Sequence, residues 1–204
     1  MIPQFDNHQR VLVTGGAGFI GGAVIRRLLK ETNTLIFNLD KIGYASDLES
    51  LQQVLFSLND TNSSDRYQHL KVDLSDSKAT LEAINYADPD LIMHLAAESH
   101  VDRSIDGPDV FLESNVLGTF NLLQASKAHW QNLKSERKNN FRFHHISTDE
   151  VYGSLGDNGR FCETTPYDPR SPYSASKACS DHLVSSWHHT YGLPVVITNC
   201  SNNY

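Results

Sequence analysis

Short apolar runs alternate along the chain with longer segments in which apolar residues recur at helical spacing. The short runs predict six buried strands, over residues 10–14, 34–39, 67–72, 90–95, 141–147 and 193–198. The periodic segments predict helices over about 19–30, 46–57, 78–86, 108–130 and 172–191, with Ser75 capping the third and Pro108 opening the fourth. Polar residues predict a loop at 59–65, a charged turn at 134–140 and a loop at 153–171.

This alternation predicts an α/β fold of the Rossmann type, a doubly wound parallel sheet with helices on both faces. Ligands of such sheets bind beyond the carboxyl ends of the strands. Chemically reactive or small residues follow five of the predicted strands, at 15–21, Asp40, Asp73, 96–100 and 148–150. We therefore expect a single site along this edge of the sheet.

Composition narrows the class of protein. The chain has 204 residues, of which 39% are hydrophobic, which suits one globular domain over residues 1–204. Its net charge of -7 argues against a broad contact with nucleic acid. No apolar run approaches the roughly 20 residues that span a bilayer, and the first residues lack the apolar core of a signal peptide. We expect a soluble, cytoplasmic protein with no membrane partner.

Cysteine and histidine spacing predicts neither disulfides nor a metal site. Cys162, Cys179 and Cys200 match no disulfide or zinc pattern, and an odd number of cysteines favours reduced thiols. The pairs 144–145 and 188–189 are histidines without carboxylate or cysteine partners at ligand spacing. We expect these histidines to have surface or core roles.

Three glycines predict a dinucleotide site. Gly15, Gly18 and Gly21 follow a strand and open a helix, where a tight turn and a helix amino end can approach a pyrophosphate. Asp40 ends the next strand, and a carboxylate there can accept both ribose hydroxyls and repel a 2′-phosphate, which favours NAD over NADP. Lys41 weakens that preference. The alternative for the three glycines is a tight strand-to-helix turn without a ligand, and the alternative for Asp40 is a solvated carboxylate at a strand end.

Two further strand ends fit the same ligand. Asp73, followed by Leu74, can accept the adenine amino group, although an acidic residue that merely leads into a helix fits equally well. Residues 95–97 are small and apolar, as expected where backbone passes close to a cofactor.

Two pairs of residues predict chemistry beyond binding. Tyr173 and Lys177 share a helix face, and a nearby ammonium lowers the pKa of a tyrosine from about 10. Asp149 and Glu150 are adjacent carboxylates, whose repulsion separates their pKa values so that one can act as acid and the other as base. The alternatives are an exposed helix face for the first pair and a solvated loop for the second.

The glycine motif, the Thr148 position and Tyr173-x-x-x-Lys177 resemble the extended short-chain dehydrogenase/reductases that act on nucleotide sugars. The segments 95–104, 145–153, 171–177 and 199–204 resemble the dTDP-glucose 4,6-dehydratase family within that group. The resemblance runs over essentially the whole chain, and residues 51–66 and 154–165 are its variable segments.

The resemblance implies a three-stage reaction on dTDP-glucose with NAD. Tyr173 takes the C4 hydroxyl proton as hydride leaves C4, and Thr148 hydrogen-bonds the C4 oxygen. Glu150 then removes the C5 proton while Asp149 protonates the departing C6 hydroxyl. The hydride then returns to C6, a proton is restored at C5, and the product is the 4-keto-6-deoxy sugar. Lys177 is expected to bond the nicotinamide ribose.

The resemblance also assigns binding positions. Phe19 and Ile20 are expected near the pyrophosphate, and Ser99, Thr148 and Asn202 at the substrate. Ser114 stands where the family often has threonine. The remaining positions expected around NAD are Asp40, Lys41, Ile42, Gly43, Asp73, Leu74, Leu95, Ala96, Ala97, Ser114 and Asn203.

One apolar stripe bears on assembly. Its spacing predicts a core-facing helix side, and because relatives pair two such helices across a dimer, we expect a homodimer that uses part of it. The stripe consists of Val110, Leu112, Val116, Leu117, Phe120 and Leu123.

Relatives continue with a carboxyl-terminal portion that holds the nucleotide and closes over the sugar. We therefore interpret the 204 residues as the NAD-binding portion of a longer enzyme, which binds NAD, has little or no dehydratase activity and exposes apolar surface. One alternative is another nucleotide-sugar enzyme, such as an epimerase or decarboxylase, which generally lacks the Asp-Glu pair. A second is a non-catalytic NAD-binding module.

Overall fold

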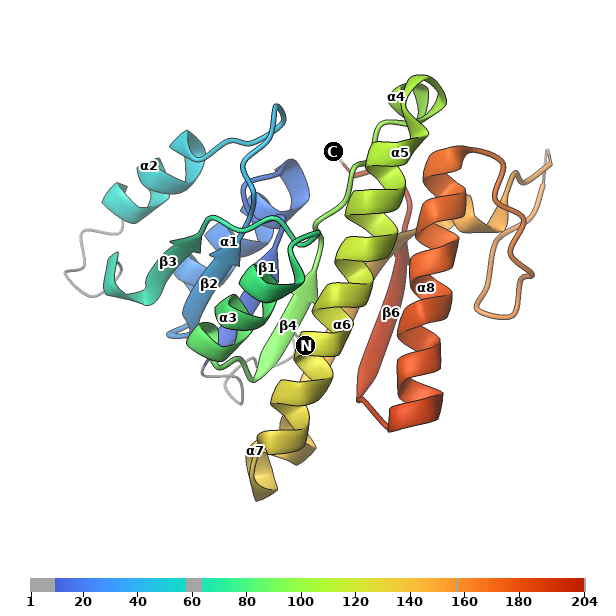
Figure 1. Cartoon of the computed structure of the whole chain (residues 1–204). Coiled ribbons are helices and arrows are strands. Elements are labelled where there is room, and N and C mark those ends of the chain that lie inside the picture. The colour runs from blue at the N-terminus through green and yellow to red at the C-terminus, as the bar shows by residue number, and fades with distance from the viewer. Residues whose placement is uncertain (1–9, 58–63, 157, 204) are drawn as a thin grey trace.

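The computed structural model describes residues 10–57, 64–156 and 158–203, and six parallel strands form one sheet within them (Figure 1). The strand order β3-β2-β1-β4-β5-β6 is doubly wound, because the chain moves outward from β1 to one edge and then from β4 to the other. The predicted fold class is confirmed. The strands are β1 Arg10–Thr14, β2 Leu35–Leu39, β3 Tyr67–Leu70, β4 Leu91–His94, β5 Arg142–Thr148 and β6 Val195–Cys200.

Helices cover both faces of the sheet (Figure 1). The predicted helices are all present, although α2 begins later than predicted. The helical elements are α1 Phe19–Glu31, α2 Glu49–Ser57, η2 Ser64–Arg66, α3 Ser77–Ala87, α4 Val101–Asp106, α5 Pro108–Phe111, η3 Leu112–Leu117, α6 Gly118–Asn132, α7 Ser135–Asn140, η4 Asp149–Tyr152 and α8 Pro172–Tyr191.

Alternate residues of β1 face two separate cores. Val11 and Val13 pack with Ile25, Leu29 and other residues against α1 and α2. Leu12, between them, packs against α3, α6 and α8 in the larger core. Since neighbouring side chains of a strand point to opposite faces, an uninterrupted apolar run indicates a strand that is covered on both sides.

Two predictions of local structure, the turn at 134–140 and the Ser75 cap, are wrong. The predicted charged turn at 134–140 contains α7, and Arg137 of this helix pairs with Asp90 at 2.6 Å and with Asp88 at 3.0 Å. Ser75 does not cap α3. Its backbone N–H donates to Asp73, and the cap is Asp76, whose carboxylate accepts from the Ala79 N–H at 2.9 Å.

The predicted helix over 108–130 is present but contains a π-helical turn, η3, between α5 and α6. The prediction that its apolar stripe is core is wrong for most of the stripe. Leu123 is fully buried, whereas Leu112 is 57% exposed, and Val110, Leu117 and Phe120 are also exposed. Helical spacing alone does not reveal which apolar faces the rest of the chain covers.

The predicted loop at 59–65 lies mostly outside the described residues, as does the amino-terminal segment 1–9. The predicted loop at 153–171 contains no helix or strand among its described residues after the end of η4. Among the helices of the described part of the chain, none has the length and apolar character needed to cross a bilayer.

Candidate active site

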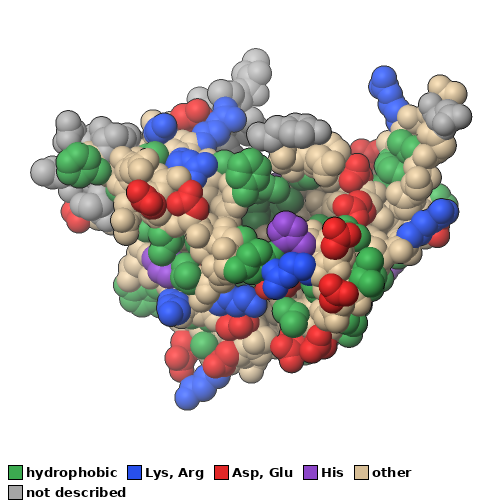
Figure 2. Space-filling view, turned by 90° about the horizontal axis from the view of Figure 1, so that it is seen from above, with side chains coloured by type: hydrophobic (Ala, Val, Ile, Leu, Met, Phe, Trp, Pro, Cys, Tyr) green, Lys and Arg blue, Asp and Glu red, His purple; other side chains and the backbone are tan. Residues whose placement is uncertain are grey.

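A cleft of about 490 Å³ runs along the carboxyl edge of the sheet, where all the strand ends meet. Figure 2 looks onto this side of the molecule, where acidic, basic and hydrophobic side chains are interspersed. The residues predicted from sequence that line the cleft are Gly15, Gly18, Phe19, Ile20, Gly21, Asp40, Lys41, Gly43, Asp73, Leu74, Leu95, Ala96, Ala97, Ser99, Ser114, Thr148, Glu150, Tyr173, Lys177, Asn202 and Asn203.

Two predicted residues do not line the cleft. Ile42 is absent from its wall, although its backbone N–H donates to Asp40 at 2.8 Å. Asp149 instead lines a neighbouring cavity of about 420 Å³ together with Glu150, Phe161 and Ser201. Because Glu150, Ser201 and Asn202 belong to both walls, the two spaces adjoin at these residues.

The glycine turn packs tightly at the end of β1 and, with the start of α1, forms one wall of the cleft, the glycine cradle. Gly15 has φ +70°, and a Cβ on it would lie 2.7 Å from the Cα of Ala96, so only glycine fits there. Gly18 is the N-cap of α1 and supplies no side-chain cap. The first N–H groups of a 13-residue helix therefore lack a side-chain acceptor at the place where a phosphate group would be stabilised.

Asp40 closes the cleft at the end of β2. Its Oδ2 accepts from the Ala17 N–H at 3.0 Å, and its Oδ1 accepts from the Ile42 N–H. The carboxylate thus joins the glycine turn to the segment after β2. These backbone bonds hold the side chain at the cleft wall, where each oxygen keeps further acceptor capacity.

Lys41 bridges three strand ends. Its ammonium lies 3.5 Å from the carboxylate of Glu98, which follows β4, and 3.8 Å from that of Asp73, which follows β3. Asp73 therefore has an ion-pair partner as well as its hydrogen bond to Ser75. Glu98 was not predicted from the sequence as a site residue.

Tyr44 also lines the cleft and was not predicted, and His100 lines it as the last residue of the predicted strand-end segment 96–100. The guanidinium of Arg103 lies 3.9 Å from the centroid of the Tyr44 ring, and the Tyr44 and His100 rings are 5.9 Å apart. These contacts join the loop after β2 to the start of α4. No sequence pattern reveals them, because they depend on the paths of two loops. Cys200 and Ser201 could have been found, since they lie at the end of the last strand.

Tyr173 and Lys177 lie on α8, which begins with a capping box formed by Ser171 and Ser174. Burial raises the pKa of Tyr173 to about 12, Glu150 adds to the rise, and a hydrogen bond with Thr148 opposes it. Lys177 donates to the carbonyl of Ile146 at 2.9 Å. The sequence-based expectation of a lowered pKa for Tyr173 is thus not met in the protein without a cofactor, because burial is the largest influence on this pKa.

Asp149 and Glu150 form the short helix η4 directly after β5. The hydroxyl of Thr148 accepts from the Glu150 N–H at 3.2 Å and holds this turn at the strand end. Burial, followed by the nearby Asp149 carboxylate, raises the pKa of Glu150. Both influences favour the protonated form of Glu150 more than in an ordinary glutamate.

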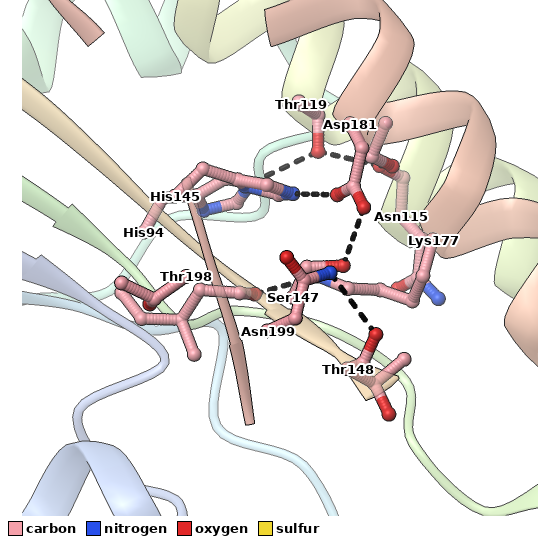
Figure 3. Close-up of polar contacts among 12 residues, drawn as sticks. His94, Asn115, Thr119, His145, Ser147, Thr148, Lys177, Asp181, Thr198 and Asn199 are labelled. Carbon is pink, nitrogen blue, oxygen red and sulfur yellow. Dashed lines mark hydrogen bonds and ion pairs between the residues drawn. The ribbon is translucent and has the colours of Figure 1, made fainter. Parts of the chain in front are cut away.

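Buried polar side chains support the cleft from below (Figure 3). His94 bonds Thr14 at 2.8 Å and Thr119 at 2.9 Å, and the Thr14 hydroxyl accepts from the Ala96 N–H. Asn115, in the π-helical turn, bonds the backbone of Glu98 on one side and the Ser176 hydroxyl on the other. These bonds fix the strand ends relative to α8.

A second buried group centres on Asp181, one helical turn after Lys177. Its carboxylate accepts from Ser147 at 2.8 Å and from Tyr167 at 2.9 Å, and lies 3.0 Å from Nε2 of His145 (Figure 3). None of these four residues was predicted as a site residue.

Within 10–57, 64–156 and 158–203, no three histidine, cysteine, aspartate or glutamate side chains gather as metal ligands would.

The chain matches known proteins over almost its whole length. Residues 12–204 match the family model described as GDP-mannose 4,6 dehydratase. The dTDP-glucose 4,6-dehydratase of Salmonella typhimurium (strain LT2) is 52% identical over 204 residues, which cover 96% of this chain and 55% of that protein. The Neisseria meningitidis serogroup B dTDP-glucose 4,6-dehydratase is 53% identical, with 96% of this chain and 54% of that protein covered. The chain thus spans about half the length of these curated relatives.

Solved structures share the fold. DesIV, a dTDP-glucose 4,6-dehydratase from Streptomyces venezuelae solved with NAD bound, superposes with a TM-score of 0.81 at 41% identity, covering 96% of this chain and 56% of that one. The Thermus thermophilus UDP-glucose 4-epimerase, a complex with NAD, gives a TM-score of 0.76 at 31% identity, covering 93% of this chain and 54% of that one. Since the family model matches residues 12–204, the chain belongs to the GDP-mannose 4,6 dehydratase family.

Proposed function

We propose that this chain is the NAD-binding and catalytic portion of a dTDP-glucose 4,6-dehydratase, which forms dTDP-4-keto-6-deoxy-glucose. The observation that carries the proposal is the adjacency of two sets of groups. The Tyr173–Lys177 face of α8 and the Asp149–Glu150 turn after β5 meet beside a cleft with a glycine cradle. Relatives above 50% identity that are named for this activity support the same assignment.

The cleft fits NAD. The tight glycine turn in the cleft wall and the uncapped amino end of α1 suit a pyrophosphate, and the Asp40 carboxylate suits the adenosine ribose hydroxyls. Lys177 is the residue that would bond the nicotinamide ribose. The other residues proposed to line the bound cofactor are those of the cleft wall, from Phe19 and Ile20 to Ser114 and Asn203. Bound NAD would supply a hydride acceptor for C4 of the sugar and the hydride for C6, while C5 would regain a proton.

The side chains of the protein then move the protons. Tyr173 takes the C4 hydroxyl proton, and Thr148, which hydrogen-bonds Tyr173, orients the C4 oxygen. Glu150, with its raised pKa, takes the C5 proton that a C4 ketone acidifies. Asp149 protonates the C6 hydroxyl, which departs as water. Ser99 and Asn202 are proposed to hold the substrate.

The decisive experiment supplies dTDP-glucose and NAD to the protein that contains this chain and analyses the product by mass spectrometry and NMR. A 4-keto-6-deoxy product that has lost water supports the proposal. An epimerised sugar of unchanged mass supports the epimerase alternative, which the Thermus thermophilus structure represents. NAD binding without turnover supports a non-catalytic module. For the 204-residue chain alone we propose NAD binding with little or no turnover.

The role of Glu150 has its own test in the same protein. Glu150→Gln removes the proposed C5 base and leaves C4 oxidation possible, so solvent deuterium should no longer enter C5. Asp149→Asn is the matched variant, because it retains that base and removes the proposed acid. Undiminished C5 exchange in Glu150→Gln would contradict the assignment.

A homodimer is also proposed. The exposed apolar residues Val110, Leu112, Leu117 and Phe120 lie on one continuous helical segment, which suits pairing with the same segment of a second copy.

A further inference from the structure

Burial raises the pKa of Asp181, whereas the charge of Lys177 and the hydrogen bonds from Ser147 and Tyr167 act in the opposite direction. Asp181 is 2% exposed, and both hydroxyls that face it, from Ser147 and Tyr167, donate to Oδ2. His145 reaches Oδ1 through Nε2. Burial holds the pKa of His145 well below its usual value, so the ring is neutral and cannot balance the charge of Asp181.

The buried cation on the same helix as Asp181 is Lys177, whose ammonium donates directly to the Ile146 carbonyl. The two residues are four apart on α8 and therefore share one helix face. Lys177 is 4% exposed, and burial lowers its pKa to about 8, while Asp181 is the largest of the influences that act in the opposite direction. Lysine ammonium groups this deeply buried remain charged only with a counter-charge nearby.

Asp181 also connects the two elements that carry the proposed chemistry. Ser147 immediately precedes Thr148 on β5, and Tyr167 belongs to the loop that packs beside it. Asp181 does not line the cleft, so it can act on bound molecules only through these neighbours.

We propose that Asp181 is a positioning residue that supplies the counter-charge for the Lys177 ammonium and fastens the end of β5 to α8. The inference deepens the proposed function, because Lys177 is the residue proposed to bond the cofactor ribose. Other titratable groups act on Lys177 or stand near it, and an experiment must separate them from Asp181. They are Tyr173 on α8, His94 on β4, His145 on β5, Glu150 in η4 and Cys200 on β6.

The test is a pH titration of the 204-residue chain with carbon-13 lysine, in which NMR follows the Cε signal of Lys177 after assignment with Lys177→Arg. Asp181→Asn keeps the shape of the side chain and removes its charge, so the pKa of Lys177 should fall by about one unit or more. Tyr167→Phe is the matched control. It removes one hydrogen bond to Asp181 and keeps the charge, so the pKa of Lys177 should stay unchanged. An equal pKa in Asp181→Asn and the unmodified chain would overturn the proposal.

A second measurement needs no substitution and covers the case in which Asp181→Asn does not fold. In the unmodified chain labelled at aspartate carboxyl carbons, the Asp181 signal should move at the pH where Lys177 loses its proton, near 8. An Asp181 signal that stays constant through that transition would equally overturn the proposal. Neither titration uses NAD, so a failure to bind NAD would remove the proposed function and leave this result intact.

The affinity for NAD tests whether the charge of Asp181 affects cofactor binding through Lys177. Calorimetry should show NAD affinity falling with rising pH, and the fall should begin about one pH unit lower in Asp181→Asn than in Tyr167→Phe. A purely structural effect of the substitution would weaken binding equally at every pH and would contradict the counter-charge role.

Discussion

Gly15 and Ala96 approach so closely that a Cβ on Gly15 would lie 2.7 Å from both the Cα and the N of Ala96. Gly15 follows β1, Ala96 follows β4, and these adjacent central strands are thereby brought together at the cleft floor. We predict that Gly15→Ala costs at least ~1–3 kcal/mol of unfolding free energy, because φ is +70° and the neighbour is backbone. NAD binding should be lost with it. Gly156→Ala, where nothing lies within 4 Å of the added carbon, is the control in urea unfolding and calorimetry.

Replacing Asp40 should change cofactor choice. Asp40→Ala removes a carboxylate that accepts two backbone N–H groups and is proposed to accept ribose hydroxyls. We expect NAD affinity to fall roughly 10- to 100-fold, from the ~1.5–3 kcal/mol of charged hydrogen bonds, and discrimination against NADP to weaken. Calorimetric titration with each dinucleotide measures both quantities. Asp40→Asn separates charge from hydrogen bonding, and an unchanged NAD-to-NADP ratio in both variants would show that Asp40 does not select the cofactor.

The pKa of Glu150 should respond to its neighbour. Burial is the larger cause of its raised pKa and the Asp149 carboxylate the second, so Asp149→Asn should lower the pKa of Glu150 without restoring its ordinary value. Carbon-13 NMR of labelled glutamate carboxyls measures this shift. Because a raised pKa keeps the base protonated to higher pH, C5 proton removal should fail on acidification earlier than with an ordinary glutamate. An unaltered Glu150 titration in Asp149→Asn would show that the carboxylates do not interact.

Buried histidines predict acid instability. Burial holds the pKa values of His94 and His145 well below 6.5 in the folded chain, whereas the unfolded chain binds protons near ~6.5. Below that pH the unfolded state takes up protons that the folded state excludes. Stability is therefore full above ~6.5 and should fall by about 1 kcal/mol for each histidine by pH ~5.5. Urea unfolding at several pH values should show a shallower dependence in His94→Gln, and exposed His189→Gln should retain the full dependence.

The exposed helical stripe should mediate self-association. Leu112 is 57% exposed, so Leu112→Lys should leave the unfolding free energy within about 0.5 kcal/mol and weaken dimer formation. Sedimentation velocity over a range of concentrations measures the effect. Leu155→Lys, at an exposed leucine in a different segment, should leave association unchanged. Equal association in both variants would place the interface elsewhere.

The order of the six strands and the five main helices could be predicted from the sequence, because apolar periodicity and the alternation of strands with helices are local properties of the chain. The sequence also placed most of the cleft residues, since the carboxyl ends of parallel strands meet at one edge whatever the details of packing. The glycine turn, Asp40, Thr148 and Glu150 lie at these strand ends, and the helical pair Tyr173 and Lys177 lines the same cleft.

Contacts between side chains of distant segments could not be predicted from the sequence and are seen in the folded chain alone. Asp181 reaches Ser147 and Tyr167, Tyr44 reaches Arg103, and Arg137 holds α7 through Asp88 and Asp90. The tertiary structure also decided that the stripe around Leu112 is exposed and that Tyr173 has a raised pKa. These properties depend on burial and on through-space distance, which a periodic pattern along the chain does not encode.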